Sequence, residues 1–431
     1  MRSLAWAALV AMVWLSCMRG AIAQPPDSAI RVASLIRLLG SESYAARVQA
    51  HSELAKLGTL SREQLVAALN DPEAEIRLRA RELLKQLKVE ELWNASRVAI
   101  DSTDAKAGEA LQLIATQTSN RIVLGDQYGN FREQTVALST GLHPFWLLMD
   151  EICSQSGNRF RAHYDTRQPG LVAVAGARTK FPVAYSGPLR STITAARRAF
   201  NEELDYEGLD SDVTHTFQLG LQMMWEERFQ LVAYRTQPEL VQARTDAGID
   251  LSAPQAPSST WSIAGGGARQ VSMNIRLQPP AVTVRKLESL KLRWGLIAIG
   301  DMATIETSEL DSAKPLFQDD VQLSIESCQA FDGGRCEVTL GVLRDAIITE
   351  PQDLFFHENE VTLFDKQGRP FRQQGQSHSL TETGAKLKIT FVGEANDSAP
   401  AKLAFRYPRI RSHRSLDLEF RDVPLPVAKP E

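Results

Sequence analysis

Two periodicities alternate between Arg97 and Ala175, and this alternation constrains the fold more than any other feature of the sequence. Short strand-like runs occur at residues 97–100, 121–124, 135–138, 160–164 and 171–175. Apolar residues at helical spacing occupy residues 107–115, and a second helical stripe follows Pro144 over residues 145–152. The resulting order, β-α-β-β-α-β-β, predicts a small α+β module in which two helices pack on short strands.

The preceding segment, residues 28–92, has the pattern of a helical domain. We expect a first helix that ends near Leu39, a second over residues 44–57 that ends at Gly58, a third with a capping signal at Ser61, and a fourth that starts at Asp71-Pro72. The fourth helix has an apolar face made of Ile76, Ala80, Leu83, Leu84 and Leu87, and a basic face made of Arg77, Arg81, Lys85 and Lys88. Because acidic residues lie four positions before Arg77 and Arg79, we favour a solvated, self-paired face over a binding site.

Two stretches carry resemblances to known families. Residues 69–80, with the sequence LNDPEAEIRLRA, resemble the loop and second helix of HEAT repeats, although only about one and a half repeats are present where a stable array needs about three. Residues 109–115 and the strand that follows at 121–124 are similar to the secretin and TonB short N-terminal domain. The second resemblance implies a docking element that contacts other envelope proteins, partly through exposed sheet edges.

The C-terminal half of the chain is rich in strand patterns. Residues 181–213 are interpreted as a connector with a helix from Thr192 to Leu204, and strand runs follow from Phe217 onwards. Three features recur after residue 310: residues 321–325 match 217–221, residues 364–368 match 244–248, and residues 387–391 match 271–275. We therefore predict tandem C-terminal β-sandwich-like domains over residues 214–310 and 316–424. The predicted fold class is multidomain: an N-terminal α-helical (HEAT-like) segment, the α+β module, and the tandem sandwiches.

The N-terminus predicts export. Arg2 precedes a short apolar core, Leu4 to Leu15, and a small-x-small cleavage site ends at Ala23, so residues 1–23 read as a signal peptide. A lipid-modified Cys17 is the alternative, but the residues before it make a poor lipobox, so the soluble form is favoured over the lipid-anchored one. No later run reaches transmembrane length. We expect a bacterial protein that is periplasmic or secreted.

Three of the four cysteines remain after cleavage. Cys328 and Cys336 flank a turn-like segment, and a three-residue hairpin loop at residues 331–333, with Gly333 in the left-handed conformation, would place them opposite one another. We predict a structural disulfide between them, with a contribution of about 2–3 kcal/mol, and keep two free buried thiols as the alternative. Cys153 is interpreted as a small buried hydrophobic residue.

Residues for catalysis or cofactor binding are not recognisable in the sequence. The formal net charge of −4 predicts no general affinity for nucleic acid. No Gly-x-Ser-x-Gly elbow or phosphate loop occurs, and the densest set of ligand types, His357-Glu358-Asn359-Glu360, lacks a second histidine at metal-ligand spacing. We therefore predict no catalytic residues, no cofactor and no metal site, and a protein that is not an enzyme.

Two features remain as candidate binding residues. Arg406, Arg409, Arg411 and Arg414 crowd one segment and could meet an anionic envelope polymer, although a solvated strand face explains them more simply. Tryptophans in the first sandwich could stack on sugar rings; core packing is favoured for Trp225 and Trp294, so Trp261, beside a polar loop, is the candidate. The leading hypothesis is a non-enzymatic interaction or scaffold protein of the cell envelope that binds envelope proteins. Its rivals are a carbohydrate-binding or cell-wall-binding protein that uses the sandwiches for an anionic polysaccharide and, with least support, a hydrolase of envelope polymers.

Overall fold

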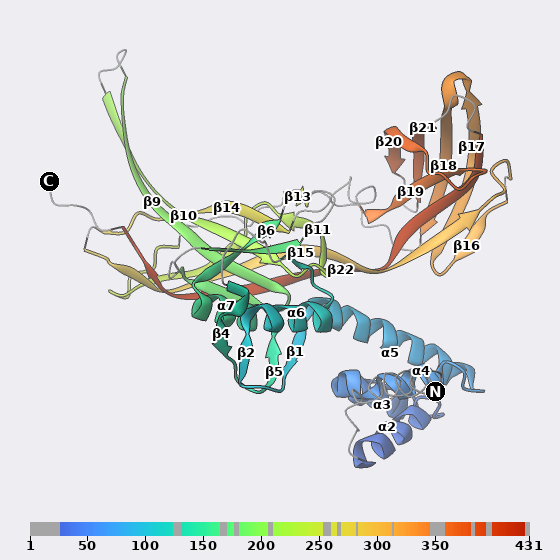
Figure 1. Ribbon diagram of the computed structural model, residues 1–431, viewed down its shortest axis with the longest axis horizontal. Helices are drawn as coiled ribbons and strands as arrows, with labels where there is room; N and C mark the ends of the chain where they lie inside the picture. The colour runs from blue at the N-terminus through green and yellow to red at the C-terminus, as the bar shows by residue number, and fades with distance from the viewer. Residues whose placement is uncertain are drawn as a thin grey trace, which may run out of the picture. The chain divides into compact units, whose positions relative to one another are not determined.

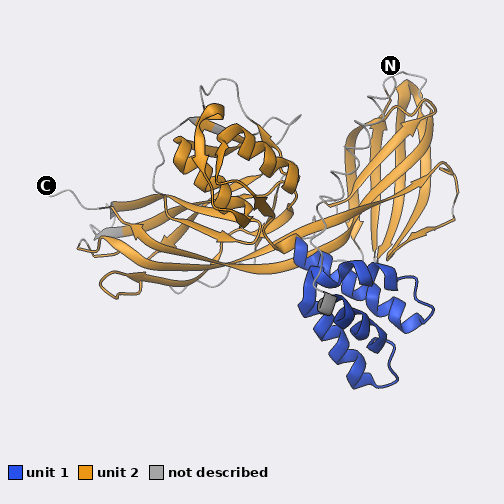
Figure 2. Cartoon of the chain, turned by 60° about the horizontal axis from the view of Figure 1, so that its bottom comes forward, with its two compact units in different colours: residues 1–91 blue, residues 92–431 orange. Residues whose placement is uncertain are grey.

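A computed structural model describes residues 26–123, 131–163, 170–175, 181–205, 210–252, 260–264, 269–281, 283–312, 314–344, 358–380, 384–393 and 399–426. The predicted signal peptide and Cys17 lie outside these residues. The chain divides into two compact units, residues 1–91 and 92–431 (Figure 2). Helices come first in the chain, and mostly antiparallel sheets follow.

The first unit is helical, as predicted (Figure 1). Its helices are α2 (Pro26–Leu38), α3 (Tyr44–Leu57), α4 (Arg62–Ala68) and α5 (Ala74–Trp93), and the last of these runs into the second unit. Gly58 ends α3 as expected, with a positive φ of 59°. The prediction that Ser61 caps α4 was wrong. The backbone there is already helical, and the hydroxyl donates back to the carbonyls of Leu54 (3.3 Å) and Gly58 (2.8 Å) instead of capping α4.

Of the two ion pairs expected on α5, the structure shows the one at Arg79, which pairs with Glu75 at 2.6 Å. Arg77 donates to the carbonyls of Asp71 and Pro72, both at 2.7 Å, and so closes the loop that precedes the helix. These two arginines therefore stabilise their own helix and loop.

The α+β module contains every element that the sequence predicts, together with two short strands that it does not. Its elements are β1 (Arg97–Ile100), β2 (Asp104–Lys106), α6 (Ala107–Thr118), β3 (Ile122–Val123), β4 (Thr135–Ala137), β5 (Gly141–Pro144), α7 (Phe145–Ser156), β6 (Asn158–His163) and β7 (Gly170–Ala175). The additional strands, β2 and β5, pair with β4 and β1, while β3, β7 and β6 form a three-stranded sheet. Both helices bury their predicted apolar stripes in one core, which includes Leu111, Ile114, Phe145 and Met149.

The rest of the second unit is an antiparallel framework of three sheets. A four-stranded sheet has the order β14-β10-β9-β8, with β8 (Val183–Ser186), β9 (Leu189–Asp205), β10 (Asp210–Trp225) and β14 (Gln270–Leu277). A six-stranded sheet has the order β13-β11-β15-β22-β19, with β12 also paired to β15; its strands are β11 (Gln230–Arg235), β12 (Glu239–Thr245), β13 (Trp261–Ile263), β15 (Lys286–Thr307), β19 (Glu360–Asp365) and β22 (Pro400–Pro424). A five-stranded sheet has the order β16-β17-β18-β21-β20, with β16 (Leu316–Gln318), β17 (Val321–Phe331), β18 (Arg335–Arg344), β20 (Arg372–Leu380) and β21 (Gly384–Val392).

The expected helix from Thr192 to Leu204 was wrong, because these residues belong to strand β9. Ala195, Ala196, Arg197 and Arg198 are good helix formers, which is why the local pattern favoured a helix. In the structure β9 pairs with β10 along its whole length, from Leu189 opposite Trp225 to Asp205 opposite Asp210. Long-range strand pairing therefore overrides the local preference.

The division into two consecutive sandwiches was also wrong. Strand β22, from the second predicted domain, pairs with β15, from the first, between Lys286 opposite Pro424 and Thr307 opposite Leu403. We call this pair the ribbon; the two strands run side by side in Figure 1. One end of β22 places Leu403 and Phe405 in the core beneath the five-stranded sheet, and its other end buries Leu418 and Phe420. The two halves therefore share one sheet.

A recurrence between the halves is nevertheless visible in the topology. The order β8-β9-β10-β14 is repeated by β16-β17-β18-β21, and the pairing of β12 with β15 is repeated by β19 with β22. The predicted match of residues 364–368 with 244–248 fits, since Gly368 (φ 77°) and Gly248 (φ 81°) close equivalent turns after β19 and β12. The match of 387–391 with 271–275 also fits, because it aligns β21 with β14. The match of 321–325 with 217–221 does not, because by sheet order the counterpart of β10 is β18 and that of β17 is β9.

Candidate functional site

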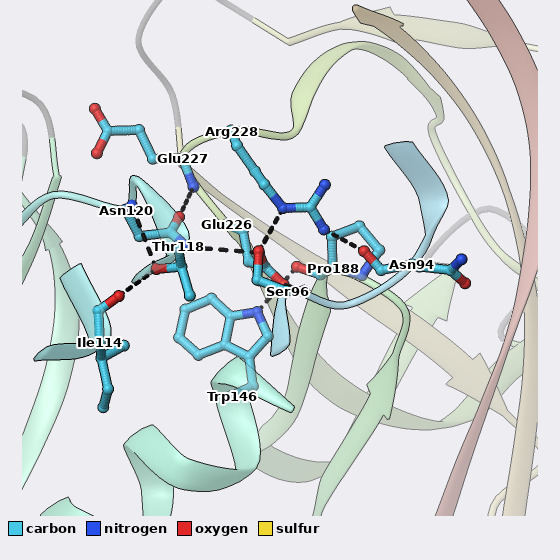
Figure 3. A network of polar contacts seen from close by, with 10 residues as sticks. All are labelled: Asn94, Ser96, Ile114, Thr118, Asn120, Trp146, Pro188, Glu226, Glu227 and Arg228. Atoms are coloured by element: carbon cyan, nitrogen blue, oxygen red, sulfur yellow. Dashed lines mark hydrogen bonds and ion pairs between the residues drawn. The ribbon is translucent and has the colours of Figure 1, made fainter. Parts of the chain in front are cut away.

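The turn after β10 carries a buried carboxylate that joins the α+β module to the framework (Figure 3). The side chain of Glu226 is fully buried, with 0% exposure. Its carboxylate accepts hydrogen bonds from the backbone N–H of Ser96 (2.9 Å), from Arg228 Nε (2.9 Å) and from Asn120 Nδ2 (3.4 Å). A buried charge is tolerated when it is paired and hydrogen-bonded, and here three donors from separate segments converge on it.

The neighbouring residues extend this network. The Glu227 N–H donates to Asn120 Oδ1 (2.6 Å), and the Glu227 carboxylate accepts from the N–H of Arg121 (2.6 Å). Arg228 donates to Ser96 Oγ (2.5 Å) and to the carbonyl of Asn94. The turn therefore holds both the start of β1 and the chain that leaves α6.

Apolar contacts and one further hydrogen bond complete the joint. Met224, at the end of β10, packs in the core of the module. The Trp146 indole, from α7, donates to the carbonyl of Pro188 at 2.9 Å, and the same carbonyl accepts from the N–H of Glu226 at 3.1 Å (Figure 3). Because the module is held from α6, α7 and β1 at once, its orientation on the framework is fixed. This arrangement is a structural joint between the module and the framework.

The four arginines predicted as a binding cluster lie on β22, and each is engaged within the chain. Arg406 pairs with Glu360 (3.0 Å), Arg409 with Asp319 (2.7 Å) and Arg411 with Glu358 (2.7 Å). The Arg411 and Glu358 side chains are 5% and 0% exposed, so this ion pair is internal. The Arg414 guanidinium lies 5.6 Å from the centre of the Trp93 ring. The sequence pattern therefore does not produce an open cationic patch.

One of these contacts, between Arg409 and Asp319, lies at the turn between β16 and β17. Burial tends to raise the pKa of Asp319, but hydrogen bonds from Arg409 and from the Tyr407 hydroxyl (2.8 Å) outweigh it and hold that pKa below its usual value. Burial and the Asp319 carboxylate raise the pKa of Tyr407. The neighbouring Asp320 accepts from Arg344 at 2.9 Å. The carboxylates at this turn therefore stabilise the framework.

Trp261 is partly covered by its neighbours. The Arg235 guanidinium lies 4.2 Å from the centre of the Trp261 ring, and the His413 ring meets it edge-on at 5.2 Å. Burial and the charge of Arg235 lower the pKa of His413, which keeps the imidazole neutral at neutral pH. Trp225 and Trp294 are buried, as predicted. One face of Trp261 is thus occupied by a side chain of the same sheet.

Cys328 and Cys336 are close but are not bonded to each other, with their sulfurs 3.7 Å apart. Gly333 is left-handed as predicted (φ 75°), but the loop comprises residues 332–334, one position later than expected. Cys328 consequently lies opposite Val338, and Cys336 opposite Ala330, so the two cysteines are diagonal neighbours. The expected direct opposition was wrong, and the disulfide itself stays a prediction. Cys153 is buried, as expected.

No group of three or more histidine, cysteine, aspartate or glutamate side chains suited to a metal ion occurs within the described residues. In the same part of the chain, no helix combines the length and apolarity needed to cross a membrane.

Fold and contacts together define a mixed α/β multidomain protein in which a small two-helix module is anchored on antiparallel sheets. Compared with known proteins, the chain matches no family model and no curated relative.

Proposed function

We propose that this chain is a non-enzymatic scaffold protein of the bacterial cell envelope, and that the α+β module at residues 97–175 docks a partner protein. The observation that carries the proposal is the buried junction around Glu226, which holds the module in one orientation on the framework. A docking element that is already oriented loses less freedom on binding, and so gains affinity. An extracytoplasmic location is part of the proposal and rests on the signal-like N-terminus.

Surfaces suited to docking remain on the module. Strand β6 ends the β3-β7-β6 sheet and has one strand neighbour within the described residues. Edge strands present unpaired backbone groups to which an extended segment of a partner can add. Three leucines in the module are also exposed: Leu142 on β5 (60%), Leu147 on α7 (46%) and Leu113 on α6 (41%).

The class of partner comes from the resemblance to the secretin and TonB short N-terminal domain, which favours another envelope protein. The HEAT-like helices offer a second contact surface of the kind that binds proteins. The rival hypothesis of polysaccharide binding was motivated by the tryptophans and the C-terminal arginines, and it loses the support of the arginines because they are engaged within the chain. The hydrolase hypothesis still rests only on compartment and fold plasticity.

The test is capture of partners by the full-length chain in its native cell. Cross-linking and mass spectrometry would compare wild type with Leu113→Asp and Leu142→Asp, and with Leu343→Asp as a matched control, since Leu343 is a leucine of similar exposure (45%) on β18. We expect at least roughly tenfold less capture of the same envelope protein with the module variants, which corresponds to about 1.4 kcal/mol. Equal capture by all four proteins, or equal loss with the control, would contradict docking by the module.

A further inference from the structure

A cleft of about 390 Å³ opens along the edge of strand β19 that pairs with no other strand in the described part of the chain, facing strand β20. The cleft is lined by Val361 and Thr362 of β19. Val361 packs against the core, and Thr362 lies on the opposite face of the strand. Side chains from both faces of a strand meet only along that strand's edge, so the cleft follows the edge of β19. Leu387 and Ile389 of β21 form its apolar floor.

The polar wall of the cleft comes from β20, whose residues from Arg372 to Ser379 are all exposed. In the register with β21, Gln373 lies opposite Phe391 and Gln376 opposite Ile389, and both of these partners are buried in the core. Opposed residues on paired strands point to the same face. The two glutamines therefore occupy inward-facing positions, where a sandwich normally places apolar side chains.

The amides in the cleft have unused hydrogen-bonding capacity. Gln373 Nε2 donates to Gln376 Oε1 at 2.8 Å, which orients both side chains. The other amide atoms, Gln373 Oε1 and Gln376 Nε2, make no hydrogen bond within the described part of the chain, and neither does the Thr362 hydroxyl. Glu360, at the rim, is neutralised by Arg406 at 3.0 Å. The wall therefore offers donors and acceptors without net charge.

By sheet order, β20 has no counterpart among the described residues of the first half; β13, which lies at the equivalent place in the chain between β12 and β14, pairs with β11 instead. In that half the equivalent sheet, β8-β9-β10-β14, ends at β14 among the described residues, whereas β21, the counterpart of β14, has β20 beside it. The cleft is thus an addition to one half and does not arise from the recurrence. Because the side chains from Arg372 to Ser379 are exposed, β20 adds little apolar burial to the core, which favours a role other than stability.

We propose that this cleft binds a neutral saccharide. Sugar hydroxyls both donate and accept hydrogen bonds, as the glutamine amides and the threonine hydroxyl do. The C–H face of a sugar ring can pack on Val361, which is only partly buried. The neutral lining disfavours charged ligands, and the volume lies in the range of about 300–1,000 Å³ typical of small-molecule sites. The site is independent of the docking surface on the α+β module.

The experiment uses the purified full-length chain, with chitotetraose, cellotetraose and maltotetraose as neutral probes in saturation-transfer NMR and calorimetry. Wild type is expected to bind at least one probe, and Gln373→Leu and Gln376→Leu to weaken binding by roughly tenfold or more, since unpaired sugar hydroxyls are then buried. Gln374→Leu is the matched control, because Gln374 lies on the same strand at its bulge and does not line the cleft. Thermal unfolding verifies that all variants fold.

Three results would overturn the proposal: no neutral probe binds wild type, the control variant loses binding as much as the cleft variants, or the cleft takes an extended peptide in preference to every sugar. Leu142→Asp, which tests docking, should leave saccharide binding unchanged. Failure of one proposal is therefore distinguishable from failure of the other.

Discussion

Glu226 shows how much of this protein depends on a single buried side chain. Its carboxylate accepts hydrogen bonds from the guanidinium of Arg228 in its own turn, and from a backbone N–H and an amide in two segments that are distant in sequence. In the sequence it sits in Trp225-Glu226-Glu227-Arg228, which has the pattern of a solvated polar turn. Nothing local separates Glu226, which is buried, from Glu227, which is only partly buried. Their burial differs because the turn directs the Glu226 side chain into the junction with the module.

Glu226→Ala is expected to destabilise the protein by about 3–5 kcal/mol, because it leaves Arg228 and Asn120 without their buried partner. Glu227→Ala, which removes one acceptor at a partly buried position, should cost about 0.5–1.5 kcal/mol. Urea unfolding followed by circular dichroism measures both values. Equal effects of the two variants would show that the buried carboxylate does not have this role.

At the level of elements, strand β9 and the cysteine hairpin show two ways in which pairing decides structure. The Ala195-to-Arg198 stretch favours a helix locally, but sixteen paired positions with β10 outweigh that preference. In the β17–β18 hairpin, a loop displaced by one residue changes every opposed pair beyond it. The spacing of the cysteines correctly indicated that Cys328 and Cys336 lie close together. The register of β17 on β18, however, is set by the position of the turn.

The predicted disulfide can be tested on this hairpin. The two sulfurs lie 3.7 Å apart, so bond formation requires only a small local movement from the free thiols. We expect exported protein to show two thiols that resist alkylation until reduction, and we expect Cys328→Ser to lower the stability of the oxidised form by about 2–3 kcal/mol. Non-reducing peptide mass spectrometry identifies the bond. Full alkylation of both cysteines without reductant would favour the free-thiol alternative.

At the scale of the whole molecule, the pairing of β15 with β22 in the ribbon is the feature that the sequence did not predict. Because β22 pairs with β15, the last strand of the second half lies in the sheet of the first half. Each half then completes its core with residues from the shared strands, such as Phe405 at one end of β22 and Phe420 at the other. The two halves should therefore unfold together.

The variants Phe405→Ala and Phe420→Ala test this coupling. Both side chains are on β22 and 0% exposed, and each completes the core of a different half. Each variant is expected to cost about 3–5 kcal/mol and to lower protection across both the four-stranded and the five-stranded sheets. Hydrogen exchange followed by mass spectrometry reports on β10 and β18 separately. If Phe405→Ala exposed β18 alone, the halves would be independent domains.

The sequence by itself determined what depends on neighbours along the chain. Helix positions in the first unit, the two helices of the α+β module, the left-handed Gly333 and the buried Trp225 and Trp294 all follow from short-range periodicity and turn chemistry. Only the tertiary structure decided the long strand β9, the ribbon, the pairing of the β22 arginines, the burial of Glu226 and the amide-lined cleft. Each of these depends on contacts between residues far apart in sequence, whose closure entropy is offset only when the whole core assembles. No local pattern of residues carries that information.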